Sequence, residues 1–236
     1  MERLPASNAV LSGYAPSGGA SSDRWLKQTL LNLVPPAFVA LVVLLWAYAP
    51  KAWTDNPNAI IVATSLTTAA VLALEWVAER HAGWRMTWRE FATDLFYVVL
   101  SATVIAWTTA TLADDPLASL KASLGITTQW AMHLPFVVQV ALVVFLIEFG
   151  QYWMHRLMHN WTPFWLTHAP HHHLTQLNAM KGAVGNPIEL FLISLSIVAL
   201  FDLPTAAVFC GFNVPAVNST FAQANVRAAT QRFYAF

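Results

Sequence analysis

The sequence predicts an all-α protein built as a multi-pass transmembrane helical bundle. Hydrophobic residues make up 57% of the chain and charged residues only 10%. Soluble domains carry about 25% charged residues, so this chain has too little polar surface to face water on all sides. Several apolar runs are about twenty residues long, the length of a helix that crosses a bilayer. The zero net charge and the scattered Lys and Arg residues give no basic surface for nucleic acid.

The apolar runs also predict the domain organisation. We expect membrane spans at about residues 30–49, 58–78, 91–112 and 133–153, followed by an apolar stretch at 187–222. That last stretch is interrupted at Asp202 and Pro204, and a helical hairpin turning there is favoured over one long span because it returns Arg227 and Arg232 to the cytoplasmic side. Residues 1–23 are rich in Ser, Gly and Ala and lack the basic-then-apolar build of a signal peptide. They are interpreted as a disordered tail ahead of a single membrane domain, residues 24–236.

The distribution of Lys and Arg predicts the orientation, because cytoplasmic loops of membrane proteins carry the excess of positive residues. With the N-terminus inside and the hairpin in place, only Lys51 and Lys121 fall outside. The other ten fall on the cytoplasmic side: Arg3, Arg24, Lys27, Arg80, Arg85, Arg89, Arg156, Lys181, Arg227 and Arg232. Residues 155–173, which hold six of the eight histidines, therefore lie on the cytoplasmic side as well.

The first histidine pair continues the fourth predicted span. His155 and His159 are four residues apart, so on a helix their imidazoles leave one face about 6 Å apart and can share a metal or face two metals. The same face carries Tyr152 and Glu148. We interpret Glu148 as an acceptor for a ligand imidazole N–H, or as a ligand itself. The alternative is a glutamate at the membrane interface whose side chain reaches water.

A second group of histidines, in the pattern HxxHH, follows nine residues later at His168, His171 and His172. Pro163 lies between the two groups and is expected to end the first helix, so the groups come from two helical segments folded against each other. His173 cannot face the same point as its two predecessors and is interpreted as an outsider. The isolated His81 and His133 are interpreted as surface or hydrogen-bonded residues.

Other metal and catalytic motifs are excluded by the residues around the histidines. A zinc protease would show HExxH, but Arg156 follows His155. The single cysteine, Cys210, excludes an intrachain disulfide and a Cys-rich metal site. Imidazole suits Zn, Cu, Fe and Ni alike, so the ligand type leaves the metal open. The fold class is therefore a helical membrane bundle with a cytoplasmic histidine-box metal site, and no catalytic residue is assigned.

The segments "EFGQYWMHRLMH" and "WLTHAPHHH" together resemble the histidine boxes of the fatty acid hydroxylase / sterol desaturase superfamily of membrane di-iron enzymes. The resemblance covers about residues 140–230. It implies that five histidines are iron ligands: His155, His159, His168, His171 and His172. It also implies O2 as co-substrate, an electron-donor protein as partner, and hydroxylation or desaturation of a C–H bond in a lipid, sterol or carotenoid-like substrate. The segment "QLNAMKGAVGNPIEL" is similar to bacterial members, which implies the bacterial inner membrane.

Two departures from the family pattern qualify this expectation. A third histidine box should follow the hairpin, but none appears up to Phe236, and Gln223 stands where a histidine would stand. An amide is a weaker iron ligand than imidazole. We therefore expect a C-terminally incomplete member that is inactive at this length. The alternative is a non-catalytic membrane protein that binds a single metal ion through its histidine boxes, because one tetrahedral ion needs only three or four ligands.

Overall fold

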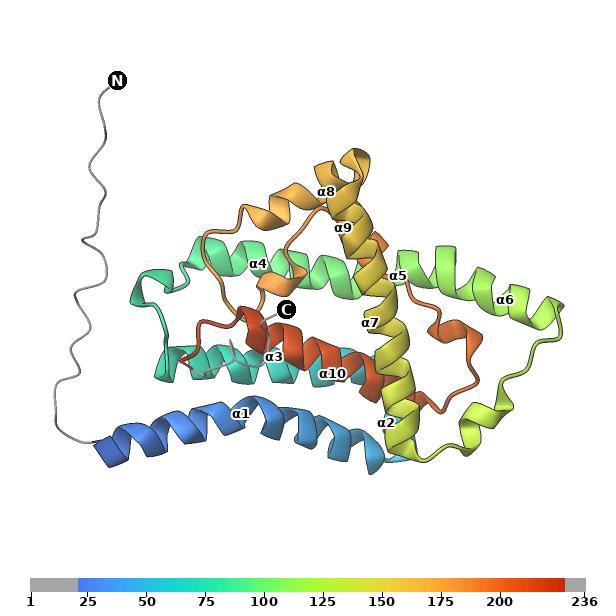
Figure 1. The fold of residues 1–236 in the computed structure, drawn as a ribbon, viewed down its shortest axis with the longest axis horizontal. Helices are drawn as coiled ribbons and strands as arrows, with labels where there is room; N and C mark the ends of the chain where they lie inside the picture. The colour runs from blue at the N-terminus through green and yellow to red at the C-terminus, as the bar shows by residue number, and fades with distance from the viewer. Residues whose placement is uncertain (1–20, 228–236) are drawn as a thin grey trace, which may run out of the picture.

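The computed structural model describes residues 21–227, and these residues form an all-helical assembly (Figure 1). The one extended pairing among them is an isolated antiparallel bridge between Glu79 and Val226. The α-helices are α1 (Ser21–Ala47), α2 (Lys51–Thr54), α3 (Ala59–Val77), α4 (Trp88–Leu100), α5 (Ala106–Thr109), α6 (Asp115–Ser123), α7 (Phe136–Asn160), α8 (Thr162–His172), α9 (Pro187–Ser194) and α10 (Thr205–Gln223). The short 3₁₀ helices are η1 (Ala82–Trp84), η4 (Gln129–His133), η5 (Lys181–Ala183) and η6 (Val198–Leu200).

Four of the described helical segments are long and apolar enough to cross a membrane: Trp25–Ala47, Ala59–Val77, Trp88–Ser123 and Phe136–Asn160. The predicted fold class, a multi-pass helical membrane protein, is thereby confirmed. The third segment extends past the predicted end at residue 112, through the π-helical turns η2 (Ser101–Ile105) and η3 (Ala110–Asp114) into α6. The predicted hairpin region contains α9 and α10. Of the predicted tail, residues 1–20 lie outside the described residues, and α1 begins at Ser21.

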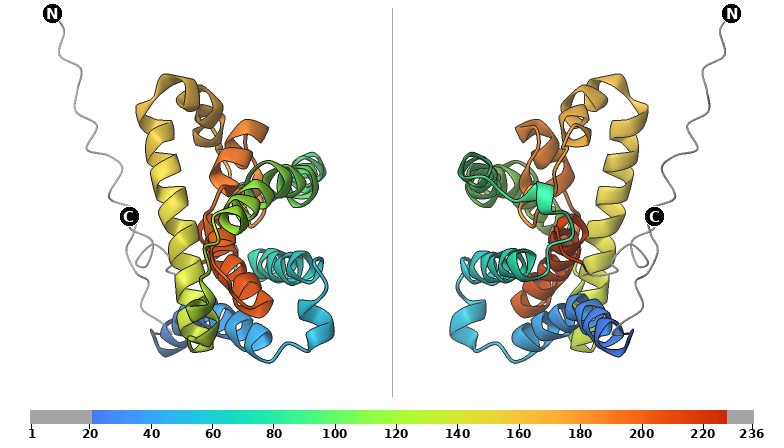
Figure 2. Two further views of the ribbon diagram at one scale, coloured as in Figure 1. Left: turned by 90° about the vertical axis from the view of Figure 1, so that its right-hand side faces the viewer. Right: turned by 90° about the vertical axis from the view of Figure 1, so that its left-hand side faces the viewer.

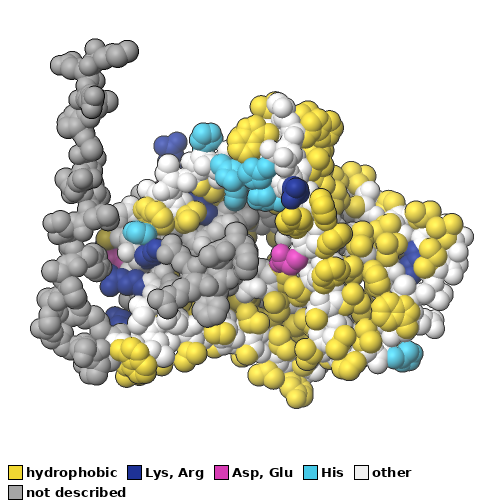
Figure 3. All heavy atoms as spheres, in the orientation of Figure 1, with side chains coloured by type: hydrophobic (Ala, Val, Ile, Leu, Met, Phe, Trp, Pro, Cys, Tyr) yellow, Lys and Arg dark blue, Asp and Glu magenta, His cyan; other side chains and the backbone are white. Residues whose placement is uncertain are grey.

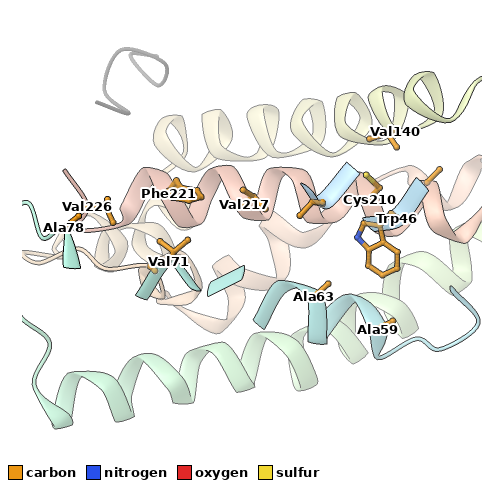
Figure 4. Packing of buried hydrophobic residues seen from close by; sticks show 13 residues of the cluster. Trp46, Ala59, Ala63, Val71, Ala78, Val140, Cys210, Val217, Phe221 and Val226 are labelled. Atoms are coloured by element: carbon orange, nitrogen blue, oxygen red, sulfur yellow. The ribbon is translucent and has the colours of Figure 1, made fainter. Parts of the chain in front are cut away.

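Helix α10 occupies the centre of the assembly and packs against α1, α3 and α7. Its apolar side chains meet those of the neighbouring helices in one cluster, whose buried members are drawn as sticks in Figure 4. Asn213 lies fully buried in this helix and makes two hydrogen bonds, one accepted from Trp46 Nε1 at 3.0 Å and one donated to Thr64 Oγ1 at 2.7 Å. The buried amide therefore has partners on both sides and joins α1, α3 and α10.

Helix α7 runs across the direction shared by α1, α3 and α10, as the views of Figures 1 and 2 agree. At the crossing with α10, Gly211 faces Val143, and both residues are buried. A Cβ atom built on Gly211 would overlap the side chain of Val143. The absence of a side chain at residue 211 thus sets how closely α7 approaches α10, and with it the position of the histidines that α7 carries at its end.

The chain between α8 and α9 is fixed by buried carboxylates of α3 and α4. Asp94 accepts hydrogen bonds from Lys181 Nζ and Asn178 Nδ2, both at 2.7 Å. Glu75 accepts hydrogen bonds from the backbone N–H groups of Ala179 and Asn225, both at 2.8 Å. Buried carboxylates are costly unless they are hydrogen-bonded, and each of these has two donors. The loop that connects α8 to α9 is therefore held in place.

Another polar contact closes the chain at the break that the sequence shows near residues 202–204. The carboxylate of Asp202 accepts hydrogen bonds from Lys121 Nζ at 2.6 Å and from the backbone N–H of Thr128 at 2.8 Å. The Lys121 contact, followed by those of Thr128, lowers the pKa of Asp202 to about 2. The connection between η6 and α10 is thus tied to the end of the third apolar segment.

The packing at the α7–α10 crossing predicts the effect of adding one methyl group. We expect Gly211→Ala to destabilise the protein by about 1–3 kcal/mol, the usual cost of forcing an extra carbon into a packed core. Thermal unfolding in detergent measures the change. Gly83→Ala is the matched control, because no atom lies within 4 Å of a Cβ built there. An unchanged transition in Gly211→Ala would contradict the close crossing.

Candidate metal centre

The candidate site is built by the end of α7 and by α8. Helix α7 carries His155 and His159 in its last turns, and α8 carries His168 and His172. The two helices are separated by Trp161, whose backbone is extended with φ −131° and ψ 118°. The sequence prediction that Pro163 ends the first helix is wrong in detail, because Pro163 lies in the first turn of α8, where its missing N–H costs no helical hydrogen bond. The expected fold-back of the two segments is present.

The fold-back brings four imidazoles to one point. Nε2 of His155 lies 2.9 Å from Nε2 of His159, and Nε2 of His168 lies 2.9 Å from Nε2 of His172. One ring nitrogen from each of these four residues lies within 4.8 Å of the other three. A metal–imidazole bond is about 2.0–2.1 Å long, so ligand nitrogens on opposite sides of one ion lie about 4 Å apart. The described cluster therefore has the size and the donor set of a metal site.

A buried carboxylate orients one of these imidazoles. Nδ1 of His168 lies 2.7 Å from Oε1 of Glu189, and the two side chains are 1% and 4% exposed. Glu189 sits in the first turn of α9, where its other oxygen accepts the backbone N–H of Asn186 in a capping box. A carboxylate can only accept, so Nδ1 of His168 carries the proton and Nε2 is left with its lone pair free for a metal. Glu189 thus fixes both the tautomer and the direction of this ring.

The four imidazoles differ in their exposure. His168 is buried, His155 is intermediate, and His159 and His172 are exposed. Histidine side chains are visible together on the surface in Figure 3. Partial burial, followed by the neighbouring imidazoles of His168 and His159, lowers the pKa of His172. A lowered pKa keeps this imidazole neutral, which is the form that binds metal.

The open side of the cluster borders a cavity of about 320 Å³. Its lining residues are His159, Asn160, Trp161, Thr162 and Trp165. The cavity gives small molecules a way to reach the imidazole of His159, whereas the buried His168 faces Glu189 of α9.

Four of the five predicted ligands converge, and His171 is not among them. Its ring stacks on that of His168 at a centroid distance of 5.6 Å, and its Nδ1 lies 3.3 Å from the carbonyl oxygen of Val184. His173 is exposed and lies outside the cluster. Gln223 ends α10 beside Gly182, and its buried Oε1 has no hydrogen-bond partner among the described residues.

The carboxylate predicted to support the histidines is in a different place. Glu148 is exposed on α7, and no hydrogen bond joins it to an imidazole within residues 21–227. Glu189 makes that contact instead. Its only sequence signal is the capping pattern of Asn186 and Glu189 at the start of an apolar run, which predicts a helix start and says nothing about a histidine.

Residues 140–235 match the model of the family described as Fatty acid hydroxylase. Over these residues the chain is similar to members of that family. The matched region contains α7 from residue 140 onward, α8, α9 and α10, and therefore all four clustered histidines and Glu189. No curated protein and no solved structure matches the chain significantly. The resemblance inferred from the histidine boxes is thus confirmed for the part of the chain that builds the site.

The hydrogen bond from His168 to Glu189 predicts a loss of metal affinity when the carboxylate is neutralised. We expect Glu189→Gln to weaken metal binding about 10–100-fold, the usual cost of changing the group that orients a ligand imidazole. Glutamine is tolerated in a capping box, so α9 should keep its start. Titration of the purified protein with Fe(II) or Zn(II) measures the affinity. Glu148→Gln is the matched control and should bind as the unchanged protein does. Equal affinity of both variants would remove the assigned role of Glu189.

Proposed function

We propose that the protein is a membrane-bound, oxygen-dependent di-iron oxidoreductase that hydroxylates or desaturates a C–H bond of a lipid, sterol or carotenoid-like substrate. The observation that carries this proposal is the four-imidazole cluster at the end of the apolar helix α7, inside the segment that matches the fatty acid hydroxylase family. The family typically holds two irons. Bound iron would supply the reduction of O2 to a species able to oxidise an unactivated C–H bond.

The residues of this chain have defined tasks in that proposal. The four clustered histidines would hold the metal, and His171 stands beside them as the fifth proposed ligand. Glu189 would hold the proton on Nδ1 of His168 and so keep Nε2 available. The apolar helices would admit a substrate directly from the bilayer, since most residues of their apolar segments are not buried inside the protein. The proposal also includes a cytoplasmic position of the site at the bacterial inner membrane and an electron-donor protein.

A second candidate function is supported by the shape of the cluster. Four imidazole nitrogens within 4.8 Å of one another suit one ion, and a single structural or stored zinc needs no further ligand. In this alternative the protein is a non-catalytic membrane protein that binds one metal. Metal analysis of the purified protein separates the two functions: close to two irons per chain favours the oxidoreductase, and a single zinc favours the alternative.

The proposed activity predicts the effect of removing one imidazole. In membranes from cells that express the whole coding sequence, supplied with a chemical electron donor and a long-chain fatty acyl lipid, a sterol or a carotenoid, we expect O2 consumption that depends on one of these substrates. His155→Ala should lower this consumption at least about tenfold, since it removes a ligand rather than only a group that supports one. His173→Ala, which changes an exposed histidine outside the cluster, should leave it intact. O2 consumption by His155→Ala at the rate of the unchanged protein would contradict the proposal.

A further inference from the structure

One indole ring lies against the metal-binding face of α8. Trp165 precedes His168 by three residues and His172 by seven, so all three side chains leave the same face of the helix. The Trp165 ring centroid lies 5.4 Å from the ring of His159, 5.6 Å from that of His172 and 6.2 Å from that of His168. Trp165 therefore contacts three of the four imidazoles that would hold a metal.

The same indole reaches the surface. Trp165 is 38% exposed and forms part of the wall of the 320 Å³ cavity beside His159. Trp161 lines that cavity too and is more exposed, at 52%, but its ring pairs with Phe164 instead of with a cluster imidazole. The Trp165 ring thus contacts both the histidine cluster and the solvent, whereas the Trp161 ring contacts the solvent and Phe164.

We propose that Trp165 is the redox-active side chain of this centre: it donates electrons when the bound metal is oxidised with no substrate in place, and it is itself oxygenated as a result. Indole is more easily oxidised than imidazole or a phenylalanine ring, and it is the ring in contact with three ligand histidines. The inference rests on the proposed function only in requiring a redox-active metal at the cluster, and it does not depend on which C–H bond is oxidised.

The chemistry balances with hydrogen peroxide as the named oxidant. The indole loses two electrons and a ring proton and gains a hydroxyl group, while peroxide takes up the two electrons and its O–O bond breaks. The net change is one indole C–H and one H2O2 converted to one indole C–OH and one H2O. The cavity beside Trp165 admits the peroxide and releases the water.

The location of the oxidation distinguishes this role from ordinary surface damage. Oxidation by a species released to solvent follows exposure, so Trp161 should be modified more than Trp165. Oxidation directed by a metal at the cluster follows contact with the ligands, so the order should be reversed. The two tryptophans lie on one tryptic fragment, residues 157–181, and peptide fragmentation assigns the added oxygen to either of them.

The experiment loads the purified full chain with Fe(II), records the bound iron, adds a small excess of H2O2 without lipid, and maps hydroxytryptophan by mass spectrometry. We expect severalfold more modification at Trp165 than at Trp161, and loss of this preference in zinc-loaded protein. In Trp165→Phe, repeated peroxide additions should release iron severalfold faster, because the ligand histidines are then oxidised instead. Trp161→Phe is the matched control and should keep iron as the unchanged protein does.

Several results would overturn the proposal. Two results would show that solvent exposure decides which tryptophan is oxidised, and they would contradict this inference alone. One is modification of the iron-loaded protein mainly at Trp161. The other is modification of Trp165 in the zinc-loaded protein to the same extent as in the iron-loaded protein. Iron release from Trp165→Phe at the rate of the unchanged protein removes the protective role. A chain that retains no iron contradicts both this inference and the proposed function.

Discussion

The hydrogen bond between His168 and Glu189 is the contact on which the rest of the site depends. It joins α8 to α9, it lies almost fully out of water, and it leaves Nε2 of His168, the candidate metal-binding nitrogen, next to Nε2 of His172 in the cluster. A carboxylate buried among apolar helices is costly unless donors surround it. Glu189 has such donors in His168 and in the backbone N–H of Asn186. The acid therefore starts one helix and orients a ring on another at the same time.

The position of Glu189 is secured by parts of the chain outside the family match. Glu75 on α3 and Asp94 on α4 precede residue 140, yet their carboxylates bind the loop that runs from α8 to α9. The N–H of Ala179 and the side chains of Asn178 and Lys181 are the donors from that loop. The first half of the chain thus supplies acceptors for the second half. A four-histidine cluster held in this way does not rely on a metal alone to define the path of the loop.

The sequence predicts the features of the structure that follow from helical periodicity, but it does not predict the contact that is set by the loop between α8 and α9. The apolar runs and the HxxxH spacing follow from helical geometry, so the all-α fold and the pairing of His155 with His159 were accessible. The HxxHH spacing was ambiguous: on an ideal helix His172 and His171 lie about 40° and about 60° to either side of His168, and the structure selects His172. Glu189 could not be found in this way, because its approach to His168 is set by the path of residues 173–186 and by the acids that anchor it.

One face of α8 carries both the clustered histidines and the indole of Trp165. The spacing that places His168 and His172 in the cluster also places this indole beside them, and the extended backbone at Trp161 separates α7 from α8. The four clustered imidazoles, one of them oriented by Glu189, are expected to be ligands of the bound iron. X-ray absorption at the iron edge of anaerobically loaded protein tests this most directly. We expect clear scattering from imidazole rings around the iron, and iron surrounded by oxygen ligands without imidazole scattering would contradict this expectation.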